Sequence, residues 1–412
     1  MIKKIYLSSN KFLFYILPIS IVFSNFLANF TVYYLALFGV YIFFKKKNYI
    51  KKNILYVILI FWLYISFRSL FASELLFSLK SSLPLIRYLF FFIAASYLIE
   101  NTKNFVKIFS LIFISFIVLL FIDAFIQFIF KKNLLGHSDS VINRISSFFS
   151  GRFVLGSYVS KIILLLFVLL NIILPINKFK LIYIIISLIS ICIILISGDR
   201  AALGLFILSL FMMFTLIDKR YFTFYQKLIS TFSILIFIVI LISSIENFKS
   251  RFFFQTKNDL NKADKIFLFS KGHQSHWQTS YKMFLDNKFF GKGPNMFRFN
   301  CDLKKFKSGK KSCSTHPHNY HMQLLGETGL VGYLLFLFLY LTLAFYLIKQ
   351  FYYVYIKKDY YLNFNKLVLL VLTFSNFWPV ITTGNFFSSF TLNLVFIPLS
   401  FYFLNEKKTE ET

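Results

Sequence analysis

The stretch at residues 316–332 holds the side chains best suited to chemistry in this chain. Its first half is polar and contains three of the six histidines, and its second half runs directly into an apolar block at 334–338. Histidine takes and returns a proton near neutral pH, so His318 is the first candidate for a general base. Pro317 suits the first turn of a helix, and the free N–H groups of such a turn favour an anion. The stretch therefore predicts a loop that enters a transmembrane helix at the membrane surface, although His318 alone could also be a surface histidine that hydrogen-bonds its own loop.

The composition places these residues in a membrane protein. The chain has 412 residues, of which 58% are hydrophobic and 21% aromatic, and its mean hydropathy is +0.70. A run of about 20 apolar residues spans a bilayer, and this sequence contains many such runs. The runs are continuous rather than alternating, which excludes a β-barrel. The expected fold class is therefore an all-α, polytopic integral membrane protein. Its formal net charge of +29 reflects in part the basic short loops of such proteins, and nucleic-acid binding is not expected.

The apolar runs divide into about twelve transmembrane spans. The first follows a basic start that resembles a signal peptide, but no small-x-small cleavage site follows it, so we interpret it as an uncleaved span. This division gives about nine spans in 1–245, one large periplasmic loop at 246–322, and about three spans with a cytoplasmic tail in 323–412. The expected spans are 12–25, 28–44, 54–71, 83–99, 105–130, 154–175, 179–197, 201–217, 228–245, 323–348, 365–383 and 387–404.

The positions of Lys and Arg give the expected orientation. With the N-terminus in the cytoplasm, the inner loops and the tail at 406–408 are basic, whereas the short outer loops near 73–74 and 382–385 are nearly free of positive charge. Both termini are then cytoplasmic, and all six histidines lie outside, in 131–153 or in 246–322. The longer segment has 15 Lys and Arg against five acidic residues, a net +10. This charge fits an anionic partner as well as it fits the general lysine richness of the chain.

The residues around His318 also form a recognisable pattern. His318-Asn319, nine further residues and then a Gly-x-x-Gly at 329–332 resemble the signature of the bacterial O-antigen ligase and polymerase superfamily. The segment 286–297 resembles the family's D-N-P-x-x-G-x-G-x-x-x-F segment, with Lys288 in place of the usual proline.

Further segments support the resemblance, which covers residues 120–340. Trp277 stands where the family often has a tryptophan, and 197–203 resembles the family's short outer turn, whose functional arginine is here Arg200. The chain departs from the family pattern at Gly151-Arg152, where an acidic residue is usual. The segments that resemble the region around the family's earlier outer loop are 123–127, 143–146 and 155–158.

The resemblance implies a membrane glycosyltransferase of the bacterial inner membrane that needs no cofactor or metal. Such an enzyme transfers a glycan from undecaprenyl pyrophosphate to an acceptor on the periplasmic face. His318 would deprotonate the acceptor hydroxyl, and Arg200 would hold the departing pyrophosphate, because guanidinium groups stay charged and bind phosphate oxygens bidentately. Arg200 could instead snorkel to the interface or pair with Asp199. The other candidate substrate-binding residues are Arg251, Arg144, Arg152, Arg298, Asn319, Asp123, Glu327 and Trp277.

The roles of the two acidic candidates and the identity of the acceptor have alternatives. Asp123 could simply pair with an arginine, and Glu327 could be a surface acid. The acceptor expected first is lipid A-core, as in an O-antigen ligase, and direct attack at the anomeric carbon predicts inversion. A polysaccharide polymerase, which lengthens a lipid-linked glycan, and a protein O-oligosaccharyltransferase share the motif. A polysaccharide transporter would show internal repeats and broken midplane helices, which this sequence does not display.

The cysteines predict a disulfide in the large loop. Cys301 and Cys313 lie outside the apolar spans with eleven residues between them, and the periplasm is oxidising. Cys192 lies within a span and is expected to pack there. Zinc binding by His316, His318, His321 and Cys313 is the alternative, but their spacing is not a standard zinc pattern. Three glycines are expected to allow close helix approach, namely Gly326, Gly329 and Gly332.

Overall fold

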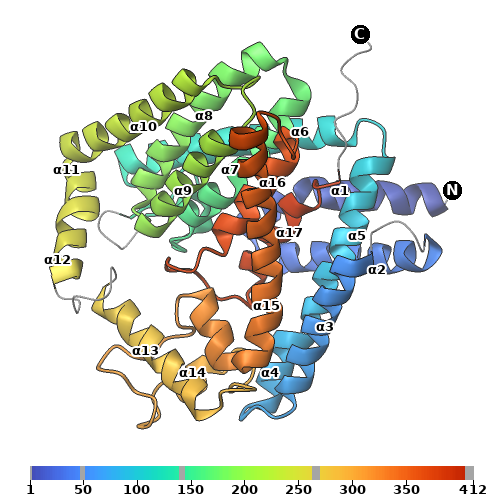
Figure 1. Cartoon of the computed structure of the whole chain (residues 1–412), viewed down its shortest axis with the longest axis vertical. Coiled ribbons are helices and arrows are strands. Elements are labelled where there is room, and N and C mark those ends of the chain that lie inside the picture. Colours follow the sequence, from blue (N-terminus) through green and yellow to red (C-terminus); the bar gives the residue numbers. More distant parts are fainter. Residues whose placement is uncertain (1, 47–51, 139–143, 262–269, 404–412) are drawn as a thin grey trace.

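The computed structural model describes residues 2–46, 52–138, 144–261 and 270–403, and its regular elements in these ranges are all helices (Figure 1). The first half contains α1 (Ile2–Phe23), α2 (Asn25–Lys45), α3 (Lys52–Ser69), α4 (Leu75–Ser82), α5 (Ile86–Asn101), α6 (Phe105–Phe130), α7 (Leu155–Ile173), α8 (Ile176–Ser197) and α9 (Arg200–Leu216). The second half contains α10 (Phe224–Ser244), α11 (Glu246–Phe248), α12 (Gln255–Asn261), α13 (Lys271–Asp286), α14 (Phe297–Asn300), α15 (Tyr320–Tyr352), α16 (Phe364–Asn376) and α17 (Ser389–Leu399).

Several residues used in the sequence argument lie outside the described ranges. They are the loop lysines Lys47 and Lys51, the motif residue Asn143, the charged residues Lys262, Asp264 and Lys265, and the tail at 406–408.

An apolar helix coincides with each predicted span, which confirms an all-helical membrane protein. Seven helical segments are long and apolar enough to cross a membrane, and five shorter apolar helices match the remaining predicted spans. Because length and composition alone identify them, the number of twelve crossings stays a prediction. The seven longer segments are Asn25–Lys45, Leu75–Asn101, Phe105–Phe130, Leu155–Ile173, Lys178–Ser197, Phe224–Ser244 and Tyr320–Lys357.

One predicted boundary is wrong. The span expected at 365–383 is helical only to Asn376, where α16 ends. Pro379 follows shortly after, and the residue before a proline is disfavoured in the helical conformation. The chain at 377–388 is therefore irregular and free to contact the start of α15, as described below.

Helix α7 lies at the centre of the bundle. It packs against α6, α8, α9, α16 and α17, and nearly all its side chains from Leu155 to Leu170 are buried. Gly156 brings its first turn against the turn between α8 and α9, because a Cβ on Gly156 would lie 2.5 Å from Ser197 Oγ and 2.7 Å from Asp199 Cβ. The contact fixes the position at which α9, and with it Arg200, begins.

The segment after α10 is folded rather than extended. In Figure 1, α10, α11 and α12 follow one another down the left side, and α13 and α14 lie at the lower end beside α4 and the lower part of α15. Arg68 of α3 donates hydrogen bonds to the carbonyl oxygens of Phe290 (2.8 Å) and Gly291 (2.6 Å), and Tyr64 donates one to Thr328 O (2.5 Å). These contacts join α3 to the chain at 290–291 and to α15.

The glycine motif has a structural explanation. Gly329 has φ 63° and interrupts the helical backbone of α15, in the left-handed region that glycine adopts at little cost. The interruption frees N–H groups of α15, so that Leu330 N and Val331 N donate to Lys288 O (2.8 Å) and Phe289 O (3.2 Å). The sequence therefore needs glycine here to join α15 to the chain that follows α13.

Candidate active site

His318 is held immediately before α15 by contacts of its own backbone and of Asn319. Its carbonyl oxygen accepts a hydrogen bond from Thr383 N at 2.8 Å, and its φ is 56°. The Asn319 side chain caps α15 by accepting from Met322 N (2.9 Å), and its amide donates to Pro379 O (2.7 Å) and Ile381 O (3.0 Å). The His-Asn pair therefore fixes the histidine between the start of α15 and the irregular chain at 377–388.

Three other histidines surround His318. Its ring centroid lies 4.1 Å from that of His316, 5.2 Å from His273 and 5.4 Å from His276. His273 and His276 lie three residues apart on α13 and so project from one face of that helix. We call these four residues the histidine cluster. Its members come from α13 and from the chain that leads into α15.

Burial keeps the histidine cluster uncharged at neutral pH. It lowers the pKa of His318 from 6.5 to about 3, and the neighbouring histidines lower that pKa further. Burial also lowers the pKa of His316 and of His273 to about 4 each, and it lowers the pKa of His276. A neutral imidazole can accept a proton, so the cluster presents proton acceptors where a substrate hydroxyl could reach them.

The cluster also has unused hydrogen-bonding capacity. Within the part of the chain that the structure describes, His273 Nδ1, His276 Nδ1 and His316 Nε2 are buried and have no hydrogen-bond partner. Buried polar atoms are nearly always hydrogen-bonded in folded proteins. These atoms are therefore available to bind a polar ligand that enters the cluster.

Arg200 lies close to the cluster, and Arg251 lies close to Arg200. Arg200 forms an ion pair with Asp259 (Nη2 to Oδ2, 2.8 Å) and donates to Thr256 Oγ1 (3.1 Å). Arg251 donates from Nε to Gly198 O (2.9 Å). Burial lowers the pKa of Arg251, and the nearby charge of Arg200 lowers it further. Because Arg200 also lowers the pKa of His273, the arginines and the histidines share one electrostatic environment.

The pairing of Arg200 differs from the alternative that the sequence suggested. Its acidic partner is Asp259 of α12, not its neighbour Asp199. Asp199 instead caps α9, since its side chain accepts from Ala202 N (3.1 Å) and from Ser157 Oγ (3.1 Å). The guanidinium of Arg200, at the start of α9, is therefore positioned by Asp259 in the folded segment after α10.

The comparison with known families covers this site. Residues 185–337 match the model of the family described as O-antigen ligase. This match supports membership of the O-antigen ligase superfamily. The match takes in Arg200, Arg251 and all four residues of the histidine cluster, and it implies a membrane glycosyltransferase-like enzyme. No curated protein matches the chain.

Some of the other candidate residues lie near the histidine cluster. Arg298 lies close enough to lower the pKa of His316 by its charge, and it donates to Asn295 Oδ1 (3.3 Å). Arg144 lies close enough to Arg251 to lower the pKa of that guanidinium, and it donates to Phe153 O (3.0 Å). Trp277 is buried on α13, next to His276.

Other candidate residues are engaged in structural contacts. Arg152 donates to Val22 O (2.7 Å) and to Asn25 Oδ1 (3.0 Å), which ties it to the turn between α1 and α2. Asp123 is fully buried and accepts hydrogen bonds from Leu134 N and Ser147 Oγ, whereas the sequence suggested an arginine partner. These contacts fix the loop after α6.

Glu327 is not a surface acid. Its side chain is 0% exposed, and its carboxylate accepts hydrogen bonds from Phe297 N (2.8 Å), Asn295 N (2.9 Å) and Gln323 Nε2 (3.1 Å). Together with Gly293 N, which donates to Glu327 O (2.7 Å), these bonds fix the chain at 293–297 against α15. The position of Arg298 follows from this arrangement.

The alternative zinc ligands are engaged elsewhere. Cys313 is bonded to Cys301. The His321 ring contacts Tyr333 Oη (3.1 Å) through Nδ1 and Phe377 O (2.8 Å) through Nε2. Among the described residues, no group of three or more His, Cys, Asp or Glu side chains is arranged to hold a metal ion.

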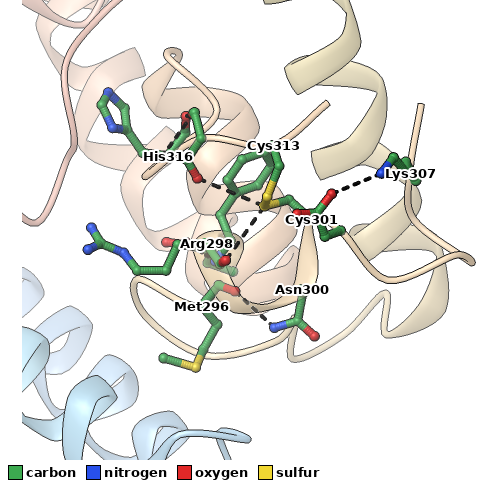
Figure 2. The surroundings of a disulfide bond; sticks show 11 residues. Met296, Arg298, Asn300, Cys301, Lys307, Cys313 and His316 are labelled. Carbon is green, nitrogen blue, oxygen red and sulfur yellow. Dashed lines mark hydrogen bonds and ion pairs between the residues drawn. A yellow bond between two sulfur atoms is a disulfide. The ribbon is translucent and has the colours of Figure 1, made fainter. Parts of the chain in front are cut away.

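The disulfide lies near His316 of the histidine cluster (Figure 2). Cys301 and Cys313 are joined with their Cα atoms 5.0 Å apart, which is the pairing expected from the sequence. Figure 2 shows Arg298 and His316 on one side of this loop and Lys307 on the other. The bond thus closes the loop whose ends carry Arg298 and His316.

We expect the disulfide to stabilise the protein. Removing it with the double substitution Cys301→Ser and Cys313→Ser should lower the free energy of unfolding by about 2–4 kcal/mol, because the closed loop restricts the unfolded chain. Thermal unfolding in detergent measures the change, and Cys192→Ser is the matched control with the bond intact. Thiol labelling of the unreduced protein provides a direct check, since free thiols at both positions would contradict the pairing.

Sequence reasoning did not select His273 and His276 as site residues. The available signal was their three-residue spacing, which places two side chains on one face if the segment is helical, next to a tryptophan. This segment falls within the expected periplasmic loop, and nothing in the sequence indicated that these residues would meet His318. Asp259 was missed for the same reason, since its contact with Arg200 spans an intervening transmembrane helix.

Proposed function

We propose that this protein transfers a glycan from undecaprenyl pyrophosphate to a hydroxyl group of lipid A-core on the periplasmic face of the bacterial inner membrane. The observation that carries the proposal is the placement of a half-buried, neutral His318 among three histidines and close to Arg200, which Arg251 adjoins. The family match supports a glycan and a lipid-linked substrate. In this proposal, 246–322 forms the periplasmic segment and both termini are cytoplasmic.

The proposed chemistry follows from the properties of the histidine and arginine side chains. The acceptor oxygen attacks the anomeric carbon of the donor sugar and gives up its proton to His318. The new carbon–oxygen bond forms as the bond to the pyrophosphate breaks, and undecaprenyl pyrophosphate leaves with the electron pair. Arg200 and Arg251 stabilise the charge that develops on the departing phosphate oxygens. Attack from the face opposite the leaving group inverts the anomeric configuration.

Donor binding also changes the histidines. An anion close to a titratable cation favours the charged form and raises its pKa. A bound pyrophosphate therefore raises the pKa of His318 from its low value in the free protein. In the proposed mechanism, His318 becomes a stronger base only when the donor is in place, which limits proton transfer in its absence.

The proposal is tested with purified protein, an undecaprenyl-pyrophosphate glycan and two acceptors, with a metal chelator present. One acceptor is lipid A-core and the other is a second lipid-linked glycan. Transfer to lipid A-core is the expected result. Lengthening of the lipid-linked glycan would show a polymerase, and the absence of transfer to either acceptor by folded protein would overturn the glycosyltransferase assignment.

Asp259 provides a test of the arginine's role. Asp259 holds the Arg200 guanidinium that the donor pyrophosphate would bind, so Asp259→Asn should free it and lower the KM for the donor about two- to fivefold. Arg200→Ala should raise that KM. Asp302→Asn, which removes a more exposed ion pair with Lys307 in the same segment, is the control. A raised KM in Asp259→Asn would instead mean that Asp259 positions Arg200 for the donor.

A further inference from the structure

A basic cavity lies at the far end of the helix that carries Arg200. Helix α9 begins at Arg200 and ends at Leu216, so its ends are about 25 Å apart. The cavity has a volume of about 620 Å³. It is lined by the turn between α9 and α10 and by the end of the π-helix that extends α15 (Tyr353–Lys357). Its charged lining residues are Asp218, Lys219, Arg220, Lys227, Lys358 and Asp359.

The charges of the cavity are not balanced. Four cationic and two acidic side chains line it, which leaves a net charge of +2. Arg220 pairs with Asp218 (2.8 Å) and stacks 4.3 Å above the ring of Tyr360. Within the described ranges, no ion pair joins Lys219 or Lys358 to a carboxylate. These two ammonium groups are therefore available to bind an anion.

The base of the cavity is fixed by hydrogen bonds. The half-buried Lys227 donates from Nζ to Ile217 O, and Tyr355 donates from its hydroxyl to Thr215 O (3.0 Å). Gln350 of α15 donates to Leu216 O (2.9 Å). The end of α9 and the end of α15 are thus joined around the cavity.

The helices that lead away from the cavity have apolar, exposed surfaces. Only 11% of the most apolar 18 residues of α10 are buried, so most of this helix is exposed and apolar. Phe224 (60%), Tyr225 (76%) and Ile229 (65%) are exposed on α10, and Ile348 (68%) and Ile356 (64%) are exposed on the α15 side. An anion bound in the cavity that also carried acyl chains could bury them along both helices.

We propose that this cavity binds the phosphate headgroup of an anionic phospholipid, whose acyl chains lie along α10 and α15. Short inner loops carry Lys and Arg for reasons of topology. Topology does not explain why Lys219 and Lys358, from two loops more than a hundred residues apart, line the same cavity. Basic pockets between transmembrane helices bind anionic headgroups. The lipid joins the C-terminal ends of α9 and α15. The opposite end of α9 carries Arg200, and the opposite end of α15 follows His318.

The test measures lipid binding to the purified full-length protein by native mass spectrometry, with phosphatidylglycerol and phosphatidylcholine as probes. The wild type should retain phosphatidylglycerol in preference to phosphatidylcholine. The double substitution Lys219→Gln and Lys358→Gln should weaken phosphatidylglycerol binding about tenfold, and Lys219→Arg with Lys358→Arg should preserve it. The matched control is Lys103→Gln with Lys107→Gln, two exposed lysines next to the start of α6.

Two results would overturn the proposal. The first is unchanged phosphatidylglycerol binding in a double glutamine variant that elutes as the folded protein. The second is displacement of the lipid by millimolar inorganic phosphate, which would assign the cavity to a soluble phosphate. The substituted lysines lie far from the histidine cluster, so the binding result does not depend on the transferase reaction.

Discussion

Replacing His318 by asparagine is expected to lower the rate of glycan transfer about 100- to 10,000-fold, the usual contribution of a general base. Asparagine removes the proton acceptor but tolerates the left-handed backbone conformation of this residue, whose φ is 56°. Alanine also removes the base, but it adds backbone strain. The single-turnover rate with a saturating donor isolates the chemical step.

The matched control for His318→Asn is His137→Ala. His137 is an exposed histidine in the shorter loop, and in the described structure it forms hydrogen bonds only through its backbone. The His137→Ala variant should transfer glycan at the wild-type rate. Transfer at the wild-type rate by His318→Asn would remove the proposed base, whereas a loss confined to donor KM would show that His318 binds the donor instead.

The substitution His276→Ala tests whether the neighbouring histidines contribute to transfer in addition to His318. His276 is 9% exposed and lies 5.4 Å from His318 between ring centroids. If it orients the substrate or His318, its loss should reduce transfer less than the loss of His318 and should change the pH profile. A change in thermal stability alone would show that it only packs.

The sequence predicted the features that depend on local composition. Each predicted span coincides with an apolar helix because a long apolar run is sufficient to specify one. Arg200 was placed correctly at the start of a helix. Cys301 and Cys313 were paired correctly, since they are the two cysteines outside the apolar runs and leave few choices. These inferences require no knowledge of which helices touch.

The features that depend on tertiary contact were not predictable in the same way. Glu327 lies on a helix that could present it to solvent, and only the packing of the chain at 293–297 shows why it is buried. His273 and His276 face His318 because α13 packs on α15. A single sequence gives the periodicity of a helix face, but not the element which that face will meet.

Replacing Gly329 by alanine is expected to prevent correct folding of the site. A Cβ at this position would lie 2.4 Å from Phe289 O and 2.5 Å from Phe289 C, both of which are backbone atoms that cannot move aside cheaply. The combination of φ 63° and ψ −168° is essentially confined to glycine and costs another residue about 1–3 kcal/mol. The substitution would also displace the backbone hydrogen bonds from Leu330 and Val331 to 288–289.

Gly204→Ala is the matched control for this glycine, because its Cβ would meet only Ile381 Cδ1 at 3.6 Å, an ordinary contact. Gly204 lies within α9, where alanine favours the helix by up to about 1 kcal/mol. We expect the control to unfold at or above the wild-type temperature, and Gly329→Ala to unfold well below it and to lose transfer. Equal melting temperatures for the two variants would show that the break in α15 is not needed to hold α13, and therefore His273 and His276, against His318.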